Sequence, residues 1–142
     1  MALGTFDFYT DAGLTNLFVG PLTPTFDVGG SPATVDFSLY LGSTNAALKL
    51  QDSVSPGINQ IAMTISDASP GSGPEATHVR LANSLLNLDT AIAGAPLNLG
   101  IELLGGVAGA FQIFFRFSFP GAGNTGLDIS IGTANNVIEV AV

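Results

Sequence analysis

The segment Phe111–Phe119 constrains the fold more than any other part of the chain. Its odd-numbered positions are all apolar, whereas its even-numbered positions carry Gln112, Phe114, Arg116 and Ser118. Because successive side chains of a β-strand point to opposite faces, this alternation gives one continuous apolar face and one mixed face. The segment is therefore predicted to be a central strand of a β-sheet, with its odd-numbered face in the core.

Other segments alternate in the same way, and residues 34–41 are the most regular of them. Gly, Pro, Asn and Asp residues separate these segments at intervals of about 8–12 residues, which is typical of an all-β sandwich or barrel. We therefore expect a single domain over residues 1–142, an antiparallel β-sandwich of immunoglobulin-like or jelly-roll type with about 8–10 short strands. The expected strands are 5–10, 25–28, 34–41, 47–51, 60–66, 97–103, 111–119, 127–131 and 138–142.

Residues 76–93 have two interpretations. Leucine and isoleucine recur here at helical spacing, at positions 81, 85, 88 and 92, and Gly94 and Pro96 would end such a helix. Asn83, Ser84 and Asn87 disfavour a helix, because their side chains compete for backbone hydrogen bonds. The alternative is a strand over 77–82 followed by a helical turn, so that at most one short helix is expected, near 81–93.

The composition argues against several classes of function. Only 10% of the residues are charged, and three basic residues against 11 acidic ones give a net charge of −8. Nucleic-acid binding requires a basic surface, so we exclude it, and an acidic chain is also poorly suited to an anionic membrane. The apolar run 103–115 is shorter than the roughly 20 residues of a spanning helix, and the first residues lack the basic segment of a secretory signal. We therefore expect no membrane insertion.

Catalytic and metal-binding constellations are not evident in the sequence. There is no Cys, His78 is the sole histidine, and no Gly-x-Ser-x-Gly motif occurs. Asp67, Ser69 and Glu75 lie in a polar stretch that could offer oxygen ligands to Ca²⁺, but their spacing is not that of an EF-hand. We expect a protein that is not an enzyme and that holds neither a cofactor nor a metal ion.

Two sets of residues are candidates for contacts with a partner. Arg116 lies mid-strand among aromatic residues, so it either forms a salt bridge with Glu102 or Asp128 or meets a partner protein together with Phe114. The second set is the apolar face of the last segment, which we expect to be an edge or swapped strand. Its residues are Ile138, Val140 and Val142.

Four segments carry a resemblance to a known class of protein. They are residues 1–9 (Met-Ala-Leu-Gly-Thr-Phe-Asp-Phe-Tyr), 39–43 (Leu-Tyr-Leu-Gly-Ser), 55–57 (Ser-Pro-Gly) and 95–100 (Ala-Pro-Leu-Asn-Leu-Gly). In these segments the chain resembles small β-sandwich accessory proteins of tailed-phage virions. The resemblance implies a virion component, such as a capsid decoration (cement) protein or a tail or baseplate protein. It implies a major capsid or tail protein as partner, with self-association, and gives no functional residue.

The sparsely charged surface has two explanations: partners cover much of it, or Ser, Thr, Asn and Gly coat a monomer. A different class of function also stays open, namely a receptor- or carbohydrate-binding module. Its candidate contacts are Tyr9, Tyr40 and the loop 67–74.

Overall fold

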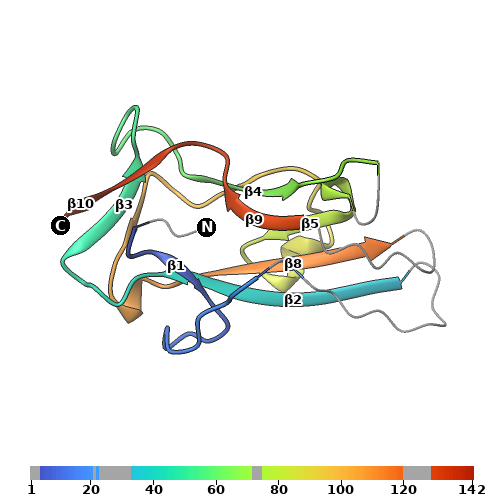
Figure 1. Ribbon diagram of the computed structural model, residues 1–142, viewed down its shortest axis with the longest axis horizontal. Coiled ribbons are helices and arrows are strands. Elements are labelled where there is room, and N and C mark those ends of the chain that lie inside the picture. Colours follow the sequence, from blue (N-terminus) through green and yellow to red (C-terminus); the bar gives the residue numbers. More distant parts are fainter. Residues whose placement is uncertain (1–3, 21, 23–32, 72–74, 120–128) are drawn as a thin grey trace.

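The computed structural model describes residues 4–20, 22, 33–71, 75–119 and 129–142. Within these residues ten strands pair antiparallel in three sheets, which form two layers (Figure 1). The four-stranded sheet forms one layer, and β4 and β9 lie over it, with β3 and β10 at the end that holds the C-terminus (Figure 1). The four-stranded sheet has the order β1 (Asp7–Tyr9), β2 (Ala33–Gly42), β8 (Phe111–Phe119), β5 (Val79–Ala82). The second sheet has the order β10 (Val137–Ala141), β3 (Leu48–Asp52), β7 (Glu102–Leu104). The third has the order β6 (Leu97–Asn98), β4 (Ala62–Asp67), β9 (Ile129–Thr133).

The strand β8 is central, as predicted, because β2 and β5 pair with its two edges. Ile113, Phe115 and Phe117 point into the core and are fully buried. The ring of Phe37, on β2, stacks on Phe115 and Phe117 with centroid separations of 4.7 and 5.4 Å. Stacked pairs of this kind stabilise a core by about 0.5–1.5 kcal/mol beyond the burial of their area.

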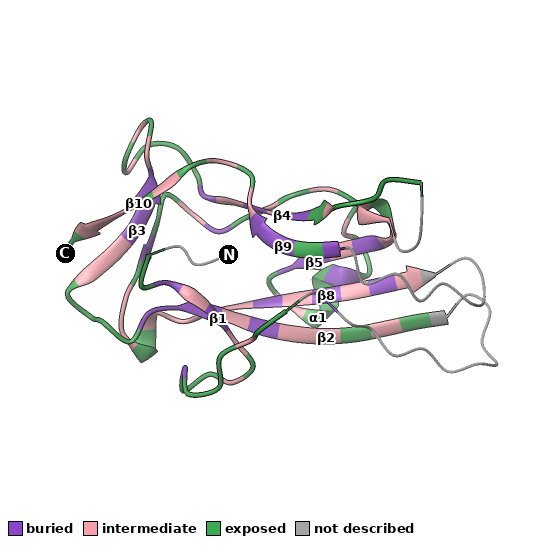
Figure 2. Ribbon diagram, in the orientation of Figure 1, coloured by how far each residue is buried: buried purple, intermediate pink, exposed green. Residues whose placement is uncertain are grey.

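The opposite layer completes one apolar core. Buried residues of β3, β4, β7 and β9 belong to the same core cluster as those of the four-stranded sheet. Figure 2 colours the buried residues of both layers purple. The all-β, antiparallel, sandwich-like fold predicted from the sequence is therefore confirmed. The side chains of this layer include Leu50, Ile61, Met63, Ile65, Leu103, Ile129 and Ile131.

The prediction of one strand over residues 97–103 is wrong. Gly100 has a φ of 111°, which turns the chain and separates β6 from β7. These two short strands join different sheets, because β6 pairs with β4 and β7 pairs with β3. Ile101, one of the apolar residues of the predicted alternation, is 44% exposed. Alternation alone could not show that the chain changes sheets at a glycine.

The interpretation of residues 76–93 as a strand and a helical turn is confirmed, and the long helix is wrong. A 3₁₀ turn, η1 (Ala76–His78), leads into β5, and the helix α1 (Leu85–Leu88) follows. The Ser84 hydroxyl caps α1 by accepting a hydrogen bond from the Asn87 amide at 3.2 Å. Polar residues that disfavoured a long helix therefore begin a short one.

The remaining strand predictions have mixed outcomes. The segments predicted at 5–10, 34–41, 47–51, 60–66 and 138–142 correspond to β1, β2, β3, β4 and β10 within one or two residues at each end. The strand expected at 25–28 lies outside the described residues, as does the start of 127–131. The pair Gly29-Gly30, which favours a hairpin turn after that strand, lies outside them too. A second 3₁₀ turn, η2 (Val107–Gly109), precedes β8. Among the described residues, no helix has the length and apolar character needed to cross a membrane.

Candidate interaction surfaces

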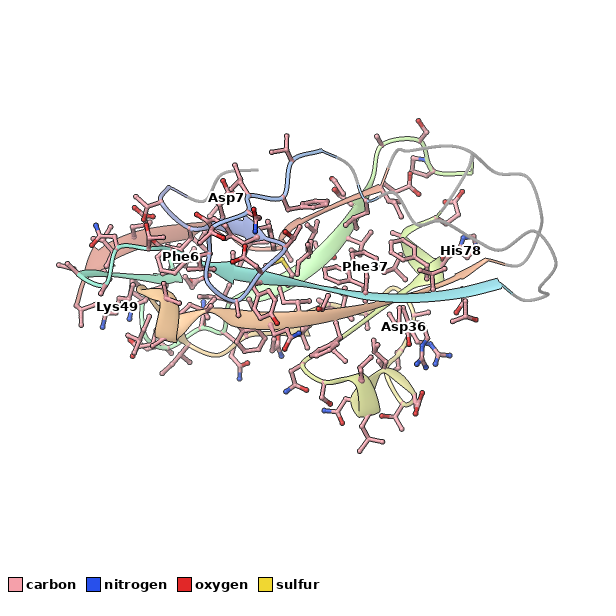
Figure 3. All side chains as sticks on the ribbon, turned by 90° about the horizontal axis from the view of Figure 1, so that it is seen from below. Phe6, Asp7, Asp36, Phe37, Lys49 and His78 are labelled. Carbon is pink, nitrogen blue, oxygen red and sulfur yellow. The ribbon has the colours of Figure 1, made fainter. Side chains whose placement is uncertain are left out.

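The side of the four-stranded sheet that points away from the core is called here the outer face. Antiparallel register places directly opposed residues on the same face, so the outer face consists of rows of side chains. One row contains Asp36, Arg116 and Arg80, from β2, β8 and β5. Figure 3 views the molecule from this side, with α1 at one border of the sheet.

Arg116 forms its salt bridges within this face. Its Nε and Nη2 donate to the two carboxylate oxygens of Asp36 at 2.7 and 2.8 Å, and Nη1 donates to Asp89 Oδ1 at 2.6 Å. The hydrogen bond from Arg116 lowers the pKa of Asp36, and those to Asp36 and then Asp89 raise the pKa of Arg116. The bidentate geometry is the strong form of this interaction.

The sequence-based choice of Glu102 as the partner of Arg116 is wrong. Glu102 lies in another sheet, where its carboxylate accepts a hydrogen bond from Lys49 Nζ at 3.0 Å. Lys49 and Asp36 lie toward opposite ends of the molecule (Figure 3). The other suggested partner, Asp128, is outside the described residues. Strand register, which places Asp36 beside Arg116, decided the pairing.

Arg80 lies directly opposite Arg116, and two like charges in such a pair repel. The Arg80 guanidinium instead donates to the backbone carbonyls of Leu88 and Asp89 at 3.3 and 3.4 Å. The segment around α1 therefore supplies acceptors to both arginines. With Lys49 bound to Glu102, every lysine and arginine side chain of the protein has an acceptor within the chain.

Further segments of the chain cover both ends of the outer face. The α1 segment packs against β5 and β8, and its Leu88 is fully buried outside the central core cluster. At the other end the buried Leu14 would contact any Cβ placed on Gly42. Phe114, a candidate interface residue, is partly buried between these two ends.

The row next to the Asp7–Gly42 row that Leu14 contacts contains the two tyrosines singled out as ligand contacts. Tyr9 and Tyr40 are directly opposed on β1 and β2, both are partly exposed, and Gln112 of β8 is opposite Tyr40. The third candidate contact, the loop after β4, is described only to residue 71 and extends from the other layer (Figure 1). The structure therefore brings together the two tyrosines, in a different layer from the strand β4 that leads into the loop.

The strand β10 presents an open backbone edge. The Val142 amide donates to the Ala47 carbonyl at 3.0 Å, and the Ser53 amide donates to the Asn136 carbonyl at 2.9 Å. Hydrogen-bonding positions alternate along an antiparallel strand, so the even-numbered residues of β10 bond to β3. The backbone groups of Val137, Glu139 and Ala141 consequently point to the other edge, where no described strand pairs with β10.

The side chains of β10 divide between two faces. Ile138 and Val140 are opposite Gln51 and Lys49, on the face away from the core. Ile138 and Val142 are 37% and 72% exposed, and Val140 is partly exposed. The last segment is therefore an edge strand among the described residues, as expected. That its side chains contact a partner stays a prediction.

Glu139 points inward and binds the N-terminal segment. One of its carboxylate oxygens accepts hydrogen bonds from the Thr5 amide, from Thr5 Oγ1 at 2.8 Å and from the Phe6 amide at 3.2 Å. Because Phe6 is fully buried, this carboxylate ties β10 to the core.

Asp52, which the sequence analysis missed, organises the loops beside β10. Its buried carboxylate accepts hydrogen bonds from the amides of Val54 and Ser55 at 2.9 and 2.8 Å and from the side chains of Asn59 and Asn135. The bond from Ser55, followed by that from Asn135, lowers the pKa of Asp52. An Asp that precedes a Ser-Val-Ser-Pro-Gly turn was the available signal.

The residues considered for Ca²⁺ bind their own loop. Asp67 Oδ1 accepts from the Ser69 amide at 2.9 Å, and Glu75 Oε1 accepts from the Gly71 amide at 2.7 Å. In the part of the chain that the structure describes, no three His, Cys, Asp or Glu side chains are grouped so that they could hold a metal ion. His78 Nδ1 accepts from the Glu75 amide at 3.1 Å, within the capped turn that begins η1.

Comparisons with protein-family models, with curated proteins and with solved structures found no match to this chain.

Proposed function

We propose that the chain is a non-enzymatic structural protein of a tailed-phage virion, most specifically a capsid decoration protein that binds the particle surface. The resemblance described above supports this proposal. The observation that carries it is the open β10 edge, with exposed apolar side chains on a strand fixed at its other edge to β3. Such an edge can bind another protein by strand addition.

The charge distribution also supports binding to a protein partner. Each lysine and arginine side chain is already bound to an acceptor within the chain, so the surplus of acidic groups makes the surface negatively charged. A basic patch on a capsid or tail protein would complement it and speed encounter more than it would raise affinity.

Electron microscopy of particles from the source, with and without this protein, tests the proposal. We expect regular density of domain size on the capsid that disappears when the protein is absent and returns when purified protein is added. Density on the tail or baseplate instead would support a tail protein and contradict decoration. No difference between the two particles would contradict a virion role.

A second function, carbohydrate or receptor binding, is favoured by one observation. Tyr9 and Tyr40 form a pair of aromatic rings on the outer face beside the Gln112 amide, which itself donates to Ser38 Oγ at 3.1 Å. Aromatic faces combined with a few hydrogen-bonding groups are typical of small-molecule sites. A glycan array probed with the wild type and with Tyr40→Ala separates the functions: glycan binding that Tyr40→Ala abolishes supports this one, and no binding refutes it.

A further inference from the structure

The free edge of β10 has a composition that suits a second copy of itself. Two copies related by a two-fold axis would place their β10 strands antiparallel, joining two β10-β3-β7 sheets into one. The exposed backbone groups belong to odd-numbered residues, so an odd-numbered residue must lie opposite an odd-numbered residue of the second copy. This condition leaves few registers.

Charge excludes one of these registers. If Glu139 lay on the axis, it would be directly opposite its own copy, and like charges so placed destabilise a strand pair. If Val140 lies on the axis, Glu139 is opposite Ala141 of the second copy. Glu139 is then also free to keep its hydrogen bonds to Thr5 and Phe6.

The same register aligns the exposed apolar side chains. Val140 meets its own copy, and Ile138 meets Val142 of the second copy, all on the face away from the core. Ile138 and Val142 are both exposed, at 37% and 72%. Pairing would therefore remove apolar surface from water while it satisfies the open edge.

We infer that the protein forms a two-fold homodimer through antiparallel pairing of β10 strands, with Val140 on the axis. The inference rests on the edge that the proposed function uses, and it names a second copy as the occupant of that edge. Dimer formation is measured with purified protein and particle binding with particles, so the failure of one is distinguishable from the failure of the other.

Disulfide cross-linking tests the register directly, because the chain has no native Cys. In a non-hydrogen-bonded antiparallel pair the Cα atoms are about 4.5 Å apart, within the range that a disulfide spans. We expect Val140→Cys to give a covalent dimer under mild oxidation, roughly tenfold faster than Ala141→Cys, which lies off the axis. Val54→Cys, at an exposed loop position, measures random collision.

Two results would overturn the inference. One is a Val140→Cys cross-linking rate no higher than that of Val54→Cys. The other is a wild type that stays monomeric in sedimentation at high concentration. Ala141→Pro provides a further test, because it removes an amide that points to the free edge and leaves the bonds to β3 in place. In the Val140→Cys background it should abolish cross-linking, with circular dichroism unchanged.

Discussion

Arg116 on β8 and Val140 on β10 both lie on the side of an alternating strand that points away from the core. Their surroundings differ. Asp36 and Asp89 bind Arg116, and the α1 segment covers its end of the face. No described segment covers the edge beside Val140. Alternation shows which residues share a face, whereas only the path of distant segments shows whether that face is covered.

Leu88→Ala is expected to have the largest effect on the stability of the covered region. Leu88 is the fully buried residue of α1, and such truncations lower the free energy of unfolding by about 2–5 kcal/mol. Urea denaturation measures the change. Leu86→Ala is the matched control, because Leu86 is 77% exposed on the same helix and should cost less than about 0.5 kcal/mol. Equal effects of the two substitutions would show that α1 does not cover the sheet.

Arg116→Ala should have the next largest effect. It removes the bidentate bond that a half-buried arginine side chain makes with Asp36, which lowers the free energy of unfolding by about 1–3 kcal/mol. Asp89 is more exposed than Asp36, so Asp89→Asn should cost less than Asp36→Asn. None of these three substitutions should alter cross-linking of Val140→Cys. Loss of dimer in Arg116→Ala would instead place the outer face in the interface.

Acidification should next destabilise the fold through two carboxylates, Asp36 on the outer face and Asp52 beside β10. The pKa values of Asp36 and Asp52 are lowered by their hydrogen bonds, so each binds a proton more readily in the unfolded chain. Their stabilisation is complete above the unfolded pKa of about 4 and decreases as the pH falls through the folded values. Thermal unfolding between pH 6 and pH 2, roughly the range in which these carboxyls titrate, measures this decrease. Asp52→Asn should make the midpoint of thermal unfolding depend less on pH. A wild type whose midpoint does not change over this pH range would contradict the prediction.

Ile138→Ser should have the smallest effect on stability. Ile138 is partly exposed at an edge, so the free energy of unfolding should change by less than about 1 kcal/mol. Its association should weaken measurably in sedimentation, because the residue meets Val142 in the dimer. A large loss of stability with unchanged association would show that Ile138 stabilises the monomer and does not contact the second copy.

Much of the fold was predictable because it depends on local pattern. The alternation in β2 and β8 identified both strands, and the polar residues 83, 84 and 87 identified a break before α1. The change of sheet at Gly100 was not predictable, since it depends on which strand lies nearby. The partner of Arg116 was missed for the same reason: its row was set by the register between β2 and β8.

The candidate surfaces, too, were predictable only where they depend on local pattern. The last segment could be recognised as an edge from its position and its apolar alternation. The hydrogen bonds of Glu139 to Thr5 and of Asp52 to Asn135 could not, because each joins residues more than 80 positions apart.

The pairing of β2 with β8 also affects how the chain folds while it is being synthesised. Residues 33–41 pair with residues 111–119, so β2 leaves the ribosome long before its partner is made. At about 5–20 residues per second, the apolar face of β2 would wait several seconds during synthesis. Long-range pairing of this kind also slows folding, because a large loop must close first. The newly made chain therefore passes through an interval in which an unpaired apolar strand is exposed to other copies.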